Sequence, residues 1–381
     1  MRDVVGSRRD LSTSQTVDEN AHSWIPAPKG IAACKLQKNK NEALGRLNFK
    51  YVASSFRSAL DESRDTDKPV ILFFQAMHGA PDAVAMGKSV LSHPLLIEAA
   101  ESLFITVVVD IEGTTPDDAQ LLARYHENCH HGTVVRILNC KGHDLAVKLE
   151  GGRCSVGNIA RAMRGVLDRK ALTVPIYLKL LETEYFDPVV APSKVLPAAP
   201  SVIFFKTKQS TEAEIDFAEV DGVVTVQCGK IYRSTAVKVI HNPDVIDCKA
   251  VLSHAMSVMT VESVCWTNER QMLMLQSELE LLDTTLLLQE FRSGSFSGGK
   301  DPKHYLRTTL LRYVPLTSLQ ALQANLAISK NELELVDNLL SPRQLAILEA
   351  VETKRPRRET VDVEILDAWT RLEGDGVFAW S

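Results

Sequence analysis

Apolar residues along the chain fall into short runs separated by amphipathic stretches, the pattern of strands that alternate with helices. Residues 70–74 (Val-Ile-Leu-Phe-Phe) and 104–109 are apolar at consecutive positions, as in strands covered by helices on both sides. Further strands are expected at 133–138 and 145–149, and helices at 51–62, 83–90, 95–102, 114–128 and 156–169. This order predicts a mixed sheet with flanking helices.

A second αβ unit follows a proline-rich stretch. Residues 185–200 hold four prolines and few charges, and we expect them to form an extended linker. Beyond it the pattern predicts strands at 202–205, 223–227 and 235–240, helices at 212–220 and 247–256, one long helix from Trp266 to Phe291, and a Gly/Ser loop at 293–299. The Leu- and Met-rich stripe of the long helix is interpreted as core.

Two helices near the C-terminus carry local start signals. Thr317 with Gln320, and Ser341 with Gln344, fit capping boxes, and Pro342 stands at the first helical position. The predicted organisation is a disordered leader (1–48), a first domain (49–184), a linker (185–200), a second domain (201–292), C-terminal helices (303–355) and a tail (356–381).

Length and composition agree with this division. A chain of 381 residues is too long for one ordinary core. No stretch approaches the roughly 18 apolar residues of a membrane helix, so no membrane span is expected. The net charge of -5 argues against nucleic-acid binding. Seven cysteines without a regular framework predict free thiols in a reducing compartment, either the cytoplasm or an organelle interior.

The region between residues 126 and 143 is rich in side chains that bind zinc. It contains His126, Cys129, His130, His131, Cys140 and His143. No Cys-x-x-Cys or second paired motif accompanies them, and a helix end that leads into a buried strand scatters their directions. We therefore interpret the region as an exposed polar loop with one buried cysteine, and expect neither a metal nor a cofactor.

The segment 68–74, together with Met86, Ser92-His93-Pro94 and 104–110, resembles a thioredoxin-fold domain over about residues 51–172. The resemblance implies a Cys-x-x-Cys at a helix N-terminus, where the first thiol attacks and the second resolves the mixed disulfide. Those positions fall on Ala80 and Ala83. The position of the family's cis-proline falls on Thr133, which we expect in the trans form. Neither half of the redox site is retained.

Residues 212–252, in particular 217–226 and 236–246, are similar to A-type peptide methionine sulfoxide reductases. The resemblance implies a Gly-Cys-Phe-Trp motif before a helix, and this chain has Gln209 at the position of the nucleophile. Glu214 matches one family glutamate, whereas Thr235 stands at the other. Without the nucleophile, Glu214 is interpreted as a solvated residue in the first turn of its helix, favoured by the helix dipole.

The domain order, with 305–307, 313–317 and 340–344, resembles a group of bacterial thioredoxin-like proteins across residues 51–348. Those proteins carry a Val-Pro-Gly-Cys or Val-Pro-Gly-selenocysteine motif at the first site. Residues 78–83 read His-Gly-Ala-Pro-Asp-Ala instead, so the redox function of the group does not carry over.

We therefore expect a catalytically silent relative of a thiol-redox protein that acts through protein binding or as a structural subunit. The alternative is an active peptide-methionine (S)-S-oxide reductase, or a thiol oxidoreductase, that uses Cys228 in a loop together with Glu214. The expected contact face for a protein partner or for the second domain comprises Met77, His78, Ala80, Pro81, His131 and Thr133.

Overall fold

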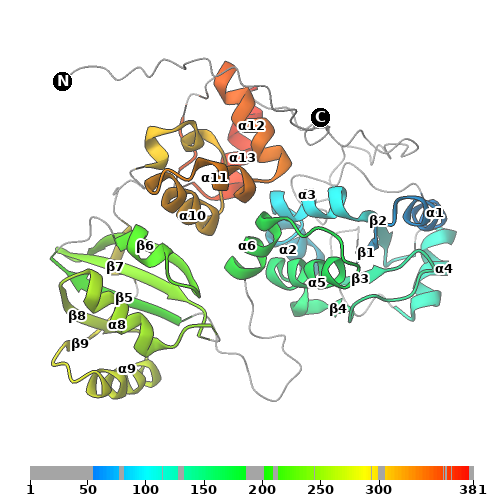
Figure 1. The fold of residues 1–381 in the computed structure, drawn as a ribbon. Helices are drawn as coiled ribbons and strands as arrows, with labels where there is room; N and C mark the ends of the chain where they lie inside the picture. The colour runs from blue at the N-terminus through cyan, green and yellow to red at the C-terminus, as the bar shows by residue number, and fades with distance from the viewer. Residues whose placement is uncertain are drawn as a thin grey trace.

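The computed structural model describes residues 55–76, 81–113, 115–127, 133–185, 201–208, 213–243, 245–292, 294–298, 305–354, 356, 358–361 and 363–376. The expected leader and all but the first residue of the expected linker lie outside these ranges. The described chain is a mixed α/β structure with two mixed sheets and a group of helices near the C-terminus that shares a core cluster with the first sheet (Figure 1). The α/β class predicted from the sequence is confirmed.

The first sheet has the strand order β2-β1-β3-β4. Its strands are β1 (Val70–Gln75), β2 (Ile105–Asp110), β3 (Val134–Leu138) and β4 (Leu149–Glu150). β1 pairs in parallel with β2 and antiparallel with β3, and β4 closes the edge next to β3. Its helices are α1 (Phe56–Thr66), α2 (Pro81–Ser89), α3 (Pro94–Leu103), α4 (Pro116–Tyr125), α5 (Val156–Arg169) and α6 (Ile176–Glu184).

All six residues of β1 are buried because both faces of this sheet are covered. Ile71 and Phe73 pack in a cluster with residues of α3, α5 and α6, whereas Leu72 and Phe74 pack with residues of α1 and α4. This arrangement confirms the prediction that the continuously apolar strand is covered on both sides.

The second sheet has the strand order β10-β6-β7-β5-β8-β9. Its strands are β5 (Ser201–Thr207), β6 (Val223–Ile231), β7 (Ser234–His241), β8 (Val261–Trp266), β9 (Leu287–Glu290) and β10 (Phe296–Gly298). α7 (Ala213–Ala218), α8 (Cys248–Val258) and α9 (Glu269–Leu281) contribute to a core cluster with this sheet. Phe205, Phe217 and Val239 are among the buried residues of that cluster.

The long helix expected from Trp266 to Phe291 is only partly confirmed, because the helix covers Glu269–Leu281. α9 begins after Asn268, whose side chain accepts from the Gln271 N–H, and the chain leaves the helix near Asp283, which has a φ of 50°. Residues 287–290 then pair in parallel with β8. A short apolar run fits a helix or a strand equally well, and here pairing with a neighbouring strand determined the outcome.

The Gly/Ser loop expected at 293–299 is also partly wrong, because residues 296–298 form β10 beside β6. Gly229 permits this close pairing. A Cβ on Gly229 would lie 2.4 Å from the Ser297 carbonyl oxygen and 2.6 Å from the ring of Phe296. Any larger residue at 229 would therefore push β10 away.

The C-terminal group comprises two 3-10 turns, η4 (Leu306–Thr308) and η5 (Leu310–Tyr313), and the helices α10 (Ser318–Ser329), α11 (Leu333–Leu339), α12 (Pro342–Thr353) and α13 (Ile365–Gly374). The capping boxes of α10 and α12 are confirmed. α13 falls in the segment assigned from the sequence to a tail, and its Trp369 is fully buried. No helix in the described part of the chain is long and apolar enough to cross a membrane.

Candidate functional site

The first candidate site lies where β1 leads towards α2. Ala83 stands at the position that the thioredoxin resemblance gives to the second thiol, and it is 3% exposed. Its carbonyl oxygen accepts from Gln75 Nε2 at 2.8 Å, while Thr133 Oγ1 donates to Gln75 Oε1. A buried, uncharged amide thus connects the end of β1, helix α2 and the residue before β3. This network positions backbone but offers no nucleophile.

The prediction that Thr133 lies on an exposed contact face is wrong, since Thr133 is 4% exposed. Its hydroxyl is directed to Gln75, and its carbonyl oxygen accepts from the Gly151 N–H at 3.0 Å and from Cys154 Sγ at 3.5 Å. Pro81 is exposed, as expected. The described residues do not include Met77, His78, Ala80 or His131. They also do not include residue 132, which forms the peptide bond with Thr133.

The second candidate site is built from α7 and β6. Glu214, in the first turn of α7, is half-buried, and its Oε1 accepts from the backbone N–H of Cys228 at 3.5 Å. The structure therefore brings together the two residues that the alternative enzyme interpretation requires. Their geometry differs from the expectation, however, because Cys228 lies within strand β6, opposite Val237 of β7, and not in a loop.

Cys228 is 5% exposed and belongs to the apolar cluster between the second sheet and its helices. Side chains alternate along a strand, so Val226 and Cys228 share the face that packs on this cluster. Sequence pattern alone missed this, because the prediction ended the strand at 227. A thiol in this position does not meet a peptide substrate unless the sheet and its helices separate.

All five cysteines in the described ranges are free thiols. Burial raises the pKa of Cys154 and of Cys248 to about 12, and it also raises the pKa of Cys265. A nucleophilic cysteine needs a lowered pKa and access to its substrate. These three thiols instead have raised pKa values and are buried.

The possible zinc region is only partly described, because Cys129, His130 and His131 lie outside the described residues. Among the residues that are described, no three His, Cys, Asp or Glu side chains come together as metal ligands. His126, Cys140 and His143 are therefore not part of such a group within the described structure.

A buried carboxylate missed by the sequence analysis joins the first domain to the C-terminal helices. Glu98 of α3 is 2% exposed, accepts from Ser341 Oγ at 2.6 Å and from the Arg343 N–H at 2.8 Å. Ser341 is the N-cap of α12, so Glu98 satisfies donors at the start of that helix. Nearby, Arg343 Nη2 lies 2.5 Å from Glu101 Oε2. The available signal was an acidic residue within the apolar run Leu-Leu-Ile-Glu-Ala-Ala.

A second acidic residue of the first domain caps the other capping-box helix. Glu184, the last residue of α6, accepts from the N–H groups of Ser318 and Leu319 at 3.0 and 2.9 Å. The two capping-box glutamines, Gln320 and Gln344, are fully buried and hydrogen-bond to each other at 2.9 Å. The starts of α10 and α12 are thus linked to each other and to the first domain.

Helix α10 also contacts the second domain. Leu319 and Leu322 belong to the same apolar cluster as Phe217, and Gln323 Nε2 donates to the Ala218 carbonyl oxygen at 3.2 Å. The C-terminal helices therefore pack on both sheet domains (Figure 1).

Comparison with protein-family models and with curated proteins gave no match for this chain.

Proposed function

We propose that the protein is a catalytically silent relative of a thiol-redox protein, with a thioredoxin-like first domain and a methionine sulfoxide reductase-like second domain. It acts as a structural subunit or through protein binding. The order of a parallel βαβ unit followed by an antiparallel pair in the first sheet supports the thioredoxin-like part. The helix α7 between β5 and β6 supports the relation of the second domain to the reductases.

The observation that carries the proposal is the placement of Cys228. This residue was the best candidate for a remaining nucleophile, and its side chain lies in the apolar core of the second domain. The carboxylate of Glu214 accepts from its backbone N–H. Reduction of a sulfoxide requires a thiolate and an acid at one accessible sulfur atom. A thiol of β6 that is buried in the core cluster shared with α7 lacks that access.

A structural role agrees with how the parts are held together. Glu98 and Glu184 bind the starts of α12 and α10, and α10 packs against the second domain. The apolar cluster that α10 shares with the second domain and the buried hydrogen bond from Ser341 to Glu98 favour one fixed arrangement of the two sheet domains. Such an arrangement suits a subunit whose surface is recognised as a whole.

Turnover assays on the full chain test the absence of catalysis. Free and peptide methionine sulfoxide are supplied with a strong chemical dithiol, and insulin reduction is followed in parallel. We expect no turnover above the rate without protein. Turnover that disappears in Cys228→Ser but persists in Cys265→Ser would establish the enzyme alternative, because Cys265 is a matched buried thiol in a different apolar cluster of the same sheet.

The protein-binding role is tested separately at the expected contact face. Pro81 is its one exposed member among the described residues. Replacing His78 and Ala80 together by arginine should weaken association with a partner by adding charge that must be desolvated, without lowering the thermal stability. If the folded double variant associates like the unchanged chain, the partner binds elsewhere.

A further inference from the structure

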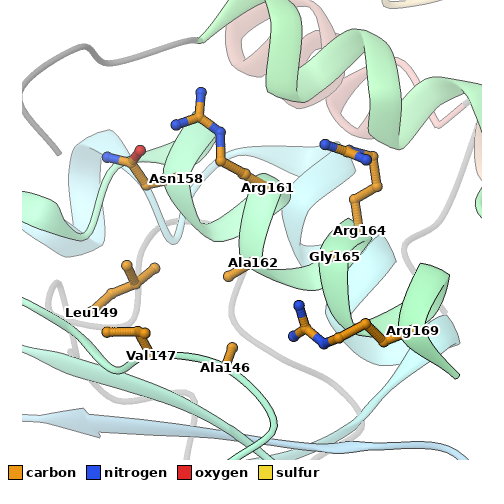
Figure 2. A pocket seen from close by; sticks show the side chains of 9 residues that line it. All are labelled: Ala146, Val147, Leu149, Asn158, Arg161, Ala162, Arg164, Gly165 and Arg169. Atoms are coloured by element: carbon orange, nitrogen blue, oxygen red, sulfur yellow. The ribbon is translucent and has the colours of Figure 1, made fainter. Parts of the chain in front are cut away.

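A pocket of about 340 Å³ lies over α5, and no lining residue belongs to either candidate site described above. Its apolar part consists of Ala146, Val147 and Leu149, before and at the start of β4, and Ala162 and Gly165 of α5. Its polar part consists of Asn158, Arg161, Arg164 and Arg169, all from α5 (Figure 2). The lining is mainly apolar with a few polar groups, and the pocket is open to solvent beside Val147, which is 84% exposed.

The helical repeat explains why these residues share one side of α5. Asn158, Ala162, Gly165 and Arg169 follow each other at intervals of three or four residues, which places them in one row. Ile159, Met163 and Val166 are on the buried side, within the core. Because Gly165 has no side chain, the middle of the row stays open.

The arginines are held in position by neighbouring acceptors. Arg161 and Arg164 share the carboxylate of Glu182 on α6, with Arg161 Nε at 3.2 Å from Oε1 and Arg164 Nε donating to Oε2. Arg164 Nη1 also lies 2.8 Å from Asp168 Oδ2. With Arg169, this region contains three guanidinium groups and two carboxylates, so the sum of these charges is positive.

One buried polar group in the pocket lacks a partner. Asn158 is 3% exposed, and its side-chain Nδ2 makes no hydrogen bond. Because this amide nitrogen is enclosed by protein atoms, it is out of reach of a ligand in the pocket. At the other end of the row, Arg169 Nη2 donates to the Leu145 carbonyl oxygen at 2.6 Å, which holds its guanidinium beside the pocket (Figure 2).

We infer that this pocket binds a small organic anion. The apolar body of the ligand lies over Ala162 and Gly165, and its carboxylate or phosphate oxygens accept from the guanidinium of Arg169. Planar guanidinium groups suit both kinds of oxyanion, and guanidiniums that are already held in place lose little freedom on binding. This site is independent of the proposed function, since it uses neither Cys228 nor the Pro81 face.

Calorimetric titration of the full chain tests the site with three probes: 2-naphthoate, 2-naphthyl phosphate and the neutral 2-naphthalenemethanol. At least one anion should bind about tenfold tighter than the alcohol, because a hydrogen bond to a charged group adds to the apolar contact. Arg169→Gln should remove most of that preference and leave the weak binding of the alcohol unchanged. Arg57→Gln, at an exposed position of α1, is the control for loss of one positive charge.

Gly165→Leu tests the location. A Cβ at this position meets only Arg169 Nη1, at 3.6 Å, and leucine favours helix more than glycine, so the variant should fold while its side chain fills the pocket. Binding of the anion should be lost. The preferred probe identifies carboxylate or phosphate as the ligand group. The inference is overturned by equal binding of the neutral alcohol, by unchanged binding in folded Gly165→Leu, or by no anion binding at about 10 mM.

Discussion

The contact between Glu98 and the start of α12 allows a quantitative test of how the C-terminal helices are held. In Glu98→Ala, the Ser341 hydroxyl and the Arg343 N–H lose their acceptor in a buried interface. Each unsatisfied donor costs about 1–3 kcal/mol. For the two donors together, we therefore expect Glu98→Ala to lower the free energy of unfolding by about 2–6 kcal/mol.

Glu98→Gln should behave differently. The amide oxygen can accept from the Arg343 N–H, and the amide nitrogen can donate to Ser341 Oγ, as a protonated carboxyl group would. The loss should therefore stay within about 1 kcal/mol. Burial is the largest influence on the Glu98 carboxyl and raises its pKa above the ordinary 4.5.

The pH dependence follows from that direction. Because folded Glu98 keeps its proton to a higher pH than the unfolded chain does, unfolding releases a proton between pH 4.5 and the raised pKa. Over this window the free energy of unfolding of the unchanged chain falls with rising pH relative to that of Glu98→Gln. As the pH rises through this window, the free energy of unfolding of Glu98→Gln should therefore increase relative to that of the unchanged chain.

Urea unfolding followed by circular dichroism measures these differences, and hydrogen exchange of residues 342–353 reports opening at α12 itself. Glu352→Ala, an exposed position on the same helix, is the control and should change stability by less than about 0.5 kcal/mol. An unfolding midpoint of Glu98→Ala equal to that of the control would refute the interface. Equal losses in the Ala and Gln variants would show that charge, and not hydrogen bonding, holds the contact.

Three further outcomes are expected. Glu184→Ala should cost about 0.5–2 kcal/mol in urea unfolding, since it removes the acceptor of the Ser318 and Leu319 N–H groups at the start of α10, with a correspondingly faster exchange of residues 318–329. Burial lowers the pKa of His93 to about 3 and of His241 to about 4. Below pH 6.5 the unfolded chain therefore binds more protons than the folded chain, and the free energy of unfolding should decline as the pH falls. His93→Leu should make this decline less steep, and an unchanged slope of the free energy of unfolding against pH would contradict the prediction. Gly229→Ala should cost about 1–3 kcal/mol and expose residues 296–298 to protease, because its Cβ meets the ring of Phe296; unchanged protection would show that β10 adapts without cost.

Local signals in the sequence were sufficient for several elements. The apolar run at 70–74 predicted a strand covered on both faces, and the helix predicted at 156–169 matches α5. The capping boxes at Thr317 and Ser341 marked the starts of α10 and α12. Each of these features depends on residues within one turn or one strand, where hydrophobic period and capping chemistry act directly.

The predictions failed where secondary structure or burial depends on residues that are far apart in the sequence. Residues 287–290 became a strand because β8 lies beside them, and residues 296–298 because β6 does. Thr133 was expected on a surface, but its hydroxyl is directed to Gln75, 58 residues earlier in the chain. These outcomes depend on long-range pairing that no local pattern contains.

The sequence by itself determined which residues stand at the positions given by the resemblances, with alanine at 80 and 83 and glutamine at 209. Side-chain chemistry is set by residue identity, so no fold can supply a thiolate there. Only the tertiary structure decided that Cys228 packs inside the second domain and that Glu98 meets Ser341, 243 residues away. Burial and hydrogen bonding are properties of neighbours in space, and those neighbours are assembled only when the chain folds.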